Sequence, residues 1–401
     1  MKLGGFEGNI TKYYLLRTLV GFRFIASIRV LFFLVFISYA QIGVTELVAA
    51  IVILALEIPS GVFADMIGRK MSMLIGTVLS TLAFLCVGLG SGLLVFAIGW
   101  ALSGASDAFH SGANEAMLYD SLQRIGREED YLKILSRLGA INAVTTIIGS
   151  IAGAYLFEIN IRLPWLLFAV CIGLSGVVIL FMKEPHISEE GYTVTNQFNH
   201  FKTAFAFCAS HETVRWLIGF LLVLSVPMFA FATLMSQPYL TNRGYQVTSL
   251  GFIFALIHGT SGLVGGLSHR VEERLGEKVS FVLITILYVT VLVLAGLWRT
   301  KVAALLLVIV LYTVNNYRGV LFDTYLNAHI RSENRATVLS IRSFLNNVVV
   351  TLLAVFIGRL IDLYTMDPVL VGMGILLGLF SIPFLVKRYR TRLPRVAQKA
   401  L

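Results

Sequence analysis

Twelve apolar runs, each close to the length of a bilayer span, most strongly limit what this chain can fold into. A helix of about 20 residues crosses the hydrocarbon core of a membrane. The predicted spans are residues 14–38, 44–64, 71–90, 93–118, 134–157, 161–182, 213–238, 247–267, 279–298, 302–326, 336–360 and 367–386. Only 13% of the 401 residues are charged, against about 25% in soluble domains. The sequence therefore predicts an all-α membrane protein with twelve transmembrane helices.

Lysine and arginine are unevenly divided between alternate connections. With the N-terminus inside, 21 of the 32 lie in cytoplasmic segments, five lie in outer loops, and the other six lie within or at the edges of spans. Such an excess predicts that both termini are cytoplasmic. It also accounts for the net charge of +10 without a nucleic-acid partner.

One connection is long and divides the spans into two groups of six. The predicted organisation is a six-helix bundle over 1–182, a linker over 183–212, a second bundle over 213–388 and a basic cytoplasmic tail over 389–401. In the linker, apolar residues recur at three- and four-residue spacing, at Phe198, Phe201, Phe205 and Cys208. This spacing favours an amphipathic helix on the inner membrane surface. A disordered linker is the alternative.

The two groups of spans repeat each other. A displacement of 208 residues carries Asp65, Gly68 and Lys70 onto Glu273, Gly276 and Lys278, Glu115 onto Asp323, and Asp107 onto Asn315. A displacement of 205 carries Arg137, Asn142 and Gly153 onto Arg342, Asn347 and Gly358. Matching polar residues in so apolar a sequence predict duplicated halves around a site near the bilayer midplane.

Residues 61–70, Gly-Val-Phe-Ala-Asp-Met-Ile-Gly-Arg-Lys, resemble the loop between helices 2 and 3 of the major facilitator superfamily (MFS) of transporters. The resemblance implies the MFS fold, with two pseudo-symmetric six-helix bundles, and alternating access. It implies a gate motif of Gly61, Asp65, Gly68, Arg69 and Lys70, with a second copy at Glu273 and Gly276. Gly61 and Gly68 would let backbones approach closely.

In that family the motif's acid caps the start of helix 11. Carried over, Asp65 would meet the start of span 11, around Ser332 to Arg335, and Arg69 would brace the turn. His269 and Glu277 replace a glycine and an arginine in the second copy, so we expect a weaker second latch.

Polar residues inside the spans are candidates for a proton and substrate pathway, because each is costly in the bilayer. In span 4, helical spacing predicts one shared face for Ser103, Asp107, His110 and Asn114, with Glu115 beside it. The corresponding candidates in spans 10 and 11 are Asn315, Asn316, Arg318, Asp323 and Arg342. A water-filled cavity is one interpretation, and hydrogen bonds between helices in a dry core are the other.

Span 1 adds Arg23 and Arg29, and at least one of them must meet an acid, with Asp107, Glu115 and Glu57 available. Burial favours a protonated carboxylic acid and an arginine neighbour favours an ionised one. Such an acid is either a proton switch or a permanent member of an ion pair at the inner gate, and both readings stay open for Glu57.

Segments 56–61 and 113–121 look like those of bacterial efflux-type members of the family. The resemblance implies a monomer in the bacterial cytoplasmic (inner) membrane that exports amphipathic compounds or drugs in exchange for protons. Gly149 and Gly153 match part of the helix-5 signature of antiporters, whose proline is missing here. The alternatives are an importer of a polar metabolite, proton-coupled or facilitative, and a transport-inactive relative that acts as a sensor.

Other classes of protein are disfavoured. The sequence contains no G-x-x-x-x-G-K-[ST] loop for ATP and no H-E-x-x-H metal motif. Its three cysteines are scattered and predict no metal site. We therefore expect no enzyme activity and no cofactor. The expected partners are a small-molecule substrate, protons and the lipid bilayer.

Overall fold

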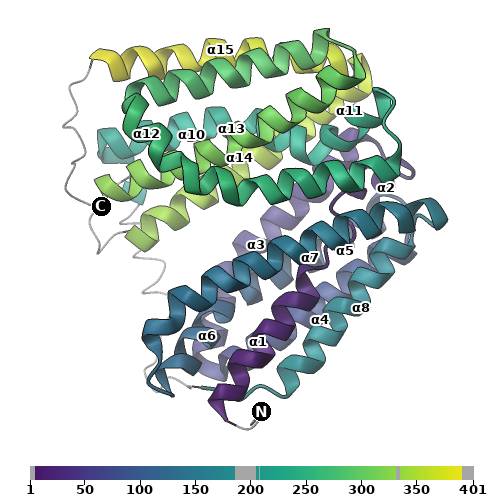
Figure 1. Cartoon of the computed structure of the whole chain (residues 1–401), viewed down its shortest axis with the longest axis vertical. Helices are drawn as coiled ribbons and strands as arrows, with labels where there is room; N and C mark the ends of the chain where they lie inside the picture. The colour runs from purple at the N-terminus through teal and green to yellow at the C-terminus, as the bar shows by residue number, and fades with distance from the viewer. Residues whose placement is uncertain (1–4, 186–204, 207, 331–334, 391–401) are drawn as a thin grey trace. The chain divides into compact units, whose positions relative to one another are not determined.

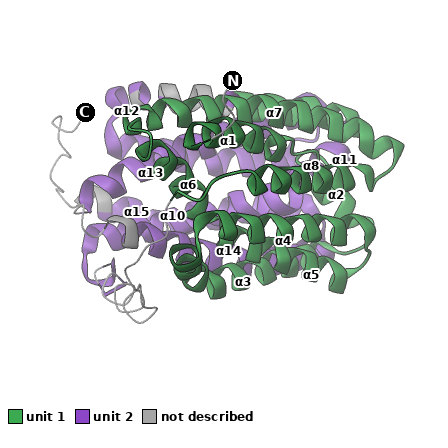
Figure 2. Cartoon of the chain, turned by 90° about the horizontal axis from the view of Figure 1, so that it is seen from below, with its two compact units in different colours: residues 1–197, 246–259 green, residues 198–245, 260–401 purple. Residues whose placement is uncertain are grey.

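The computed structural model describes the chain except for residues 1–4, 186–204, 207, 331–334 and 391–401. All regular elements in the described residues are helices (Figure 1). The helices form two compact units, coloured separately in Figure 2. Unit 1 holds residues 1–197 and 246–259, and unit 2 holds residues 198–245 and 260–401. The proposed amphipathic helix of the linker lies largely outside the described residues.

Unit 1 contains eight α-helices, a 3₁₀ turn and the first part of α12. They are α1 (Phe6–Gly21), α2 (Arg29–Leu34), α3 (Tyr39–Ile67), α4 (Arg69–Leu89), α5 (Leu93–His110), α6 (Ala113–Gln123), η1 (Glu128–Asp130), α7 (Tyr131–Ile159) and α8 (Leu163–Leu180). Helix α4 packs against both α5 and α8, and α3 packs along α5. Aromatic side chains from α2, α5 and α8 form one core cluster, which comprises Phe32, Phe33, Phe96, Trp100 and Trp165.

The first predicted span is broken, which corrects the expectation of one helix over 14–38. Helix α1 ends at Gly21 and α2 begins at Arg29, and the seven residues between them are not helical. Two glycines of α7 allow this segment to approach. A Cβ at Gly149 would lie 2.7 Å from the backbone nitrogen of Arg23, and one at Gly153 would lie 1.8 Å from the carbonyl oxygen of Phe24. Both glycines therefore allow the non-helical segment to lie directly against the backbone of α7.

The fourth predicted span is also broken, which corrects the single polar face expected over residues 103–114. Helix α5 ends at His110, Gly112 has a φ of 73°, and α6 begins at Ala113. A positive φ of this kind suits glycine because it has no Cβ. Asp107 and Asn114 therefore lie on separate helices.

Unit 2 contains α10 (Glu212–Ala230), a π-helical turn η2 (Phe231–Met235), α11 (Ser236–Asn242), the greater part of α12 (Val247–Leu297), α13 (Lys301–His329), α14 (Arg335–Tyr364) and α15 (Met366–Arg390). Helix α10 packs against α13, α14 and α15. The core of unit 2 includes an aromatic cluster of Trp216, Phe220, Phe281, Phe322 and Phe384. Helix α12 is bent at Gly276, where φ is 70°.

Ten helical segments in the described residues are long and apolar enough to cross a membrane. The other two predicted spans are the broken first one and a shorter apolar helix at Val247–Thr260. Large apolar side chains such as Leu94 and Ile159 are about three-quarters exposed, as expected for surfaces that face lipid. The prediction of an all-α membrane protein is confirmed.

Candidate functional site

The predicted gate motif forms the turn between α3 and α4. Helix α3 ends at Ile67, Gly68 has a φ of 116°, and α4 begins at Arg69. A Cβ at Gly68 would lie 2.6 Å from Oε2 of Glu184. The backbone conformation therefore favours glycine here, and an added Cβ would displace the carboxylate of Glu184.

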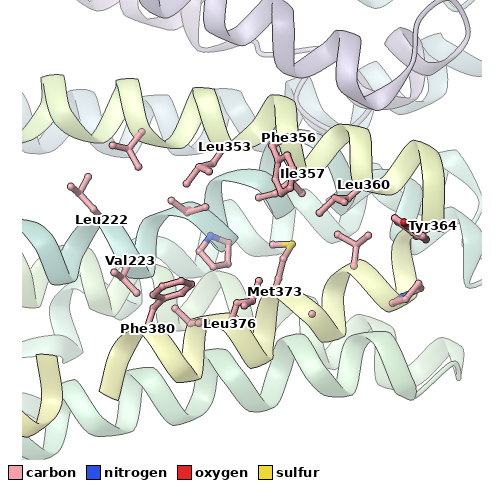
Figure 3. A pocket seen from close by; sticks show the side chains of 17 residues that line it. Leu222, Val223, Leu353, Phe356, Ile357, Leu360, Tyr364, Met373, Leu376 and Phe380 are labelled. Carbon is pink, nitrogen blue, oxygen red and sulfur yellow. The ribbon is translucent and has the colours of Figure 1, made fainter. Parts of the chain in front are cut away.

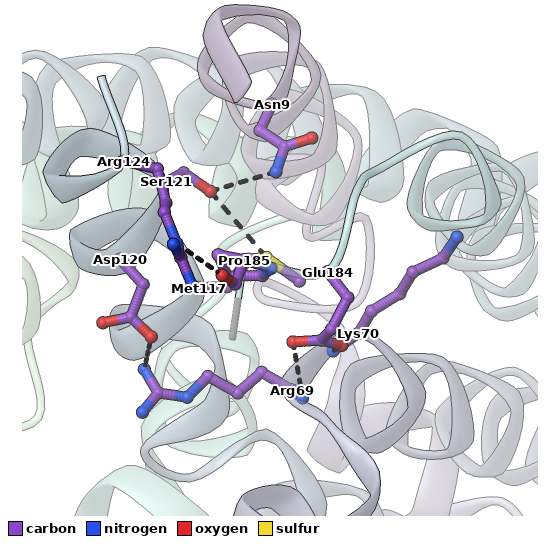
Figure 4. Close-up of polar contacts among 9 residues, drawn as sticks. All are labelled: Asn9, Arg69, Lys70, Met117, Asp120, Ser121, Arg124, Glu184 and Pro185. Carbon is purple, nitrogen blue, oxygen red and sulfur yellow. Dashed lines mark hydrogen bonds and ion pairs between the residues drawn. The ribbon is translucent and has the colours of Figure 1, made fainter. Parts of the chain in front are cut away.

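Glu184 caps the first turn of α4 from a distant part of the sequence. Its carboxylate accepts hydrogen bonds from the backbone nitrogens of Arg69, at 3.1 Å, and Lys70, at 2.8 Å (Figure 4). The first amides of a helix have no partner within the helix, and the positive end of the helix dipole favours a carboxylate. Sequence reasoning missed this residue, because nothing in its spacing links it to the motif.

Arg69 also braces the turn through its side chain, in an ion pair with Asp120 of α6 (Figure 4). Both side chains are mostly buried, at 21% and 15% exposed. Lys70 Nζ donates a hydrogen bond to the carbonyl oxygen of Leu180, at 2.7 Å. The start of α4 is thereby tied to α6 and to the end of α8.

The same end of unit 1 holds the start of α1. Asn9 donates hydrogen bonds to Ser121 Oγ, at 3.0 Å, and to the carbonyl oxygen of Lys183, at 2.8 Å, and it accepts one from the Lys183 backbone nitrogen. Arg124 donates to the carbonyl oxygen of Pro185, at 2.8 Å (Figure 4). Residues 183–185 are therefore held by α1, α4 and α6 together.

Two further predictions for the gate motif concern the close backbone approach at Gly61 and the partner of Asp65. A Cβ at Gly61 would meet no described atom within 4 Å, so the close backbone approach predicted at Gly61 is absent from the described structure. The partner predicted for Asp65, around Ser332 to Arg335, lies largely outside the described residues. That contact stays a prediction.

The second copy of the motif keeps the same backbone feature. Gly276 has a φ of 70° and ψ of 166°, close to the extended ψ of 150° at Gly68. Its neighbourhood is different, because a Cβ there would meet no described atom within 4 Å. Near this copy, Tyr325 of α13 donates a hydrogen bond to Glu272, the residue before Glu273.

The acids predicted in unit 1 are exposed, although they belong to helical segments that could cross a membrane. Glu57 on α3, Asp107 on α5 and Glu115 on α6 are all exposed. None of the three forms an ion pair with a described residue. Arg23, in the non-helical segment, is also exposed and attracts Asp107 electrostatically. Asp107 is one of the three acids that the sequence analysis named as available to the arginines of the first span.

Arg29 has a partner that the sequence analysis did not consider. Its Nη1 lies 2.5 Å from Oε1 of Glu46 on α3, and its guanidinium lies 5.9 Å from the ring centre of Trp100. The partner of Arg29 is therefore an acid other than Asp107, Glu115 and Glu57. The break after Gly21 displaces Arg29 from the position it would have on a continuous helix.

His110 bonds to neighbouring helical residues. Its ring nitrogens lie 3.2 Å from Thr77 Oγ1 on α4 and 3.2 Å from Ser106 Oγ. A Cβ at Gly76 would lie 2.9 Å from the ring. His110 therefore fits the interhelical hydrogen bonding that was the alternative to a water-filled cavity.

Unit 2 contains a polar cavity of about 440 Å³ between α10, α13 and α14. Four predicted residues line it: Asn315, Arg318, Asp323 and Arg342. Arg318 donates to Ser225 Oγ at 2.5 Å and to Asn315 Oδ1 at 2.9 Å, and Arg342 forms an ion pair with Asp323. Asn316, also predicted, is not among the lining residues.

The cavity also has lining residues that were not singled out as site candidates. Ser225, Ser343 and Asn346 supply further polar groups, and Met228 and Phe229 supply apolar surface from α10. Phe231 and Met235, in the π-helical turn η2 that follows α10, are buried in the unit. Helical spacing from Arg342 could have identified Asn346, one turn further along α14.

A second cavity in unit 2, of about 590 Å³, is apolar (Figure 3). It lies between α10, α14 and α15, and its lining includes Leu222, Phe356, Met373 and Phe380. Because none of its lining residues is charged, it lacks the groups that recognise an ionic substrate.

Comparison with known proteins gives one family. The model of the Major Facilitator Superfamily matches residues 14–350. A curated relative in Bacillus subtilis (strain 168), the "Uncharacterized MFS-type transporter YxaM", is 30% identical over 260 residues, which are 62% of this chain and 62% of that protein. "Multidrug resistance protein 1" of the same organism is 28% identical over 178 residues, 44% of this chain and 43% of that protein. The chain thus spans less than two thirds of either relative.

Solved structures share the fold. The nucleoside transporter NupG superposes with a TM-score of 0.80 at 13% identity, covering 98% of this chain and 100% of that one. A bacterial homolog of the human lysosomal transporter Spinster, in an inward-facing and unoccupied conformation, gives a TM-score of 0.69 at 13% identity, covering 95% and 94%. At this identity the likeness shows the fold alone.

Proposed function

Because the chain belongs to the major facilitator superfamily, we propose that it is a secondary transporter that exports small amphipathic molecules in exchange for protons. Members of a transporter family move their substrates and do not convert them, so the chain is not an enzyme. The proposal places the protein in the bacterial cytoplasmic membrane, as a monomer with both termini in the cytoplasm.

The observation that carries proton coupling is the set of exposed carboxylates in segments that could cross a membrane. Glu57, Asp107 and Glu115 have no ion-pair partner among the described residues. An ionisable group in a membrane span is expensive, and it is found where it faces water and has a task. Arg23 favours the ionised form of Asp107, and the apolar surroundings favour the protonated form. These opposed effects suit a group that binds and releases a proton in each cycle.

The proposed conformational cycle is a rocking of residues 1–182 against residues 213–388, with the linker 183–212 between them. Asp65 and Arg69 would latch the inner gate, and Glu273 and Gly276 would form the weaker second latch. The ion pair of Arg69 with Asp120 supports this role, because it fixes the turn between α3 and α4, directly after the last turn of α3 that carries Asp65. The four candidates that line the polar cavity in unit 2 would contact the substrate, namely Asn315, Arg318, Asp323 and Arg342.

Purified protein in liposomes, with an imposed pH gradient and a pH-sensitive dye inside, tests the coupling. Adding candidate substrates one at a time should produce proton movement opposite to the movement of the substrate. Movement of both in the same direction would make the protein a symporter and overturn export. Substrate flux without proton movement would leave a facilitator, and substrate binding without any flux would support a sensor.

Single substitutions identify the proton carrier. Glu57→Gln, Asp107→Asn and Glu115→Gln each remove one carboxylate, and we expect one of them to abolish proton movement while substrate binding persists. Glu129→Gln is the matched control, because Glu129 is exposed in η1 and has no described partner. Unchanged coupling in all three variants would refute these acids as carriers.

A further inference from the structure

We propose that the polar cavity of unit 2 binds the anionic group of an amphipathic organic anion, with Arg318 as its main ligand. The inference rests on the proposed transport function and names the charge of the substrate, which that function leaves open. It is carried by the charges and hydrogen bonds of the residues that line the cavity.

The first argument is the balance of charge. The cavity is lined by three charged side chains, Arg318, Asp323 and Arg342. Asp323 is paired with Arg342. Arg318 has no carboxylate within ion-pair distance among the described residues. Its hydrogen-bond acceptors Ser225 and Asn315 are neutral, and so is the nearby hydroxyl of Tyr288. The lining therefore has an excess of one positive charge, which a bound anion would neutralise.

The second argument is the unfilled bonding capacity of the guanidinium. Nη1 and Nη2 of Arg318 each donate to one neighbour, whereas its Nε is buried and has no acceptor among the described residues. Ser225 and Asn315 hold the group in place, since Asn315 Oδ1 also accepts from Tyr288 Oη at 3.2 Å. A fixed guanidinium with spare N–H groups suits a carboxylate, sulfonate or phosphate, whose oxygens it can bind in pairs.

The rest of the lining describes the remainder of the ligand. The side-chain oxygen of Asn346 is buried and has no donor among the described residues. It would accept a hydrogen bond from a hydroxyl or amide group of the ligand. Leu221, Met228 and Phe229 form an apolar side of the cavity, and a volume of about 440 Å³ is in the range of small-molecule sites. The expected ligand has an acidic group, a hydrogen-bond donor and an apolar or aromatic body.

Equilibrium binding to the purified full-length protein tests the proposal without any proton gradient. Radiolabelled salicylate is the probe, since it carries a carboxylate, a hydroxyl donor and an aromatic ring. The competitors are benzoate, which lacks the donor, benzyl alcohol, which lacks the charge, and benzylammonium, which reverses it. We expect salicylate to bind best, benzoate to compete more weakly, and benzyl alcohol and benzylammonium to compete least.

Two variants assign the site. Arg318→Gln should weaken salicylate binding by about tenfold or more, because it removes a charge-assisted hydrogen bond, and Arg318→Lys should recover part of the loss. Arg299→Gln, an exposed arginine of the same unit, is the control and should bind salicylate normally. Asn346→Ala should reduce the preference for salicylate over benzoate.

The outcomes that overturn the proposal are equally definite. Equal competition by benzoate and benzylammonium, no binding of any anion in the series, or unchanged salicylate affinity in Arg318→Gln would each refute an anion site. If Arg318→Gln does not fold, the competition series on the unaltered protein still decides the charge preference. Arg318-dependent binding without proton-coupled flux would retain this site and reject the proposed antiport. Proton-coupled flux without Arg318-dependent binding of anions would retain the antiport and reject this site.

Discussion

Arg69 and Asp120 form an ion pair that joins the first turn of α4 to α6, across 51 residues of sequence. The same arginine has its backbone nitrogen bound by Glu184. Two carboxylates therefore hold the turn of the gate motif through Arg69. Asp120 binds the side chain of this arginine, and Glu184 binds its backbone nitrogen.

Loss of the ion pair should destabilise unit 1. Asp120→Asn leaves the mostly buried guanidinium of Arg69 without its counter-charge, and we expect a loss of about 1–3 kcal/mol in the free energy of unfolding, the range for an unsatisfied buried polar group. Thermal unfolding in detergent measures it. Arg127→Gln, which breaks an exposed pair with Asp130, should change stability by less than about 1 kcal/mol. Equal effects of the two variants would contradict a structural role for the buried pair.

Removing the charge of Glu184 should loosen the start of α4. Glu184→Gln weakens a cap whose loss costs about 0.5–2 kcal/mol, so the amide hydrogens of Arg69 and Lys70 should exchange faster, by up to roughly thirtyfold. Hydrogen exchange followed by mass spectrometry on peptides from this region measures the change. Unaltered exchange in the variant would show that Glu184 does not hold the helix start.

Two glycines on one helix should respond to alanine in opposite directions. At Gly153 the new methyl group would collide with the carbonyl oxygen of Phe24, so Gly153→Ala should destabilise the protein by about 1–3 kcal/mol. At Gly139 of α7 no described atom lies within 4 Å of the added Cβ. Gly139→Ala should therefore stabilise the helix by roughly 0.5–1 kcal/mol. Thermal unfolding of the two variants checks the contrast, which would be lost if the segment 22–28 were not packed on α7.

Export of a monoanion in exchange for one proton should depend on the membrane potential. Each cycle would move the equivalent of two positive charges inward, which corresponds to roughly 4–5 kcal/mol at 100 mV, inside negative. Salicylate export from liposomes should therefore accelerate when valinomycin and a potassium gradient impose that potential. Export that is independent of the potential would exclude this stoichiometry.

The sequence predicted the all-α membrane fold and the repeated glycine turn because each depends on local composition or on spacing along the chain. The broken first span was not predictable in this way. Residues 22–28 contain neither proline nor glycine. The space for their backbone is provided by Gly149 and Gly153, more than a hundred residues later in the sequence.

The site was predicted in part for a related reason. The polarity of spans 10 and 11 and their correspondence to the first half indicated Asn315, Arg318, Asp323 and Arg342, which line one cavity. It missed Glu46 as the partner of Arg29 and Glu184 as the cap of α4, because both contacts depend on how separate helices pack. The prediction of one polar face over residues 103–114 assumed a continuous helix. The break at Ser111 and Gly112 divides that face between α5 and α6.

The glycine turn in the two halves bears on how a duplicated chain diverges. Gly68 is constrained twice, by its positive φ and by the carboxylate of Glu184, whereas Gly276 is constrained by its φ without a neighbouring atom within 4 Å among the described residues. The charges around the second copy have changed, since Glu277 occupies the position of Arg69, yet the glycine remains. At this turn the two halves therefore differ in charge and share a backbone conformation that suits glycine.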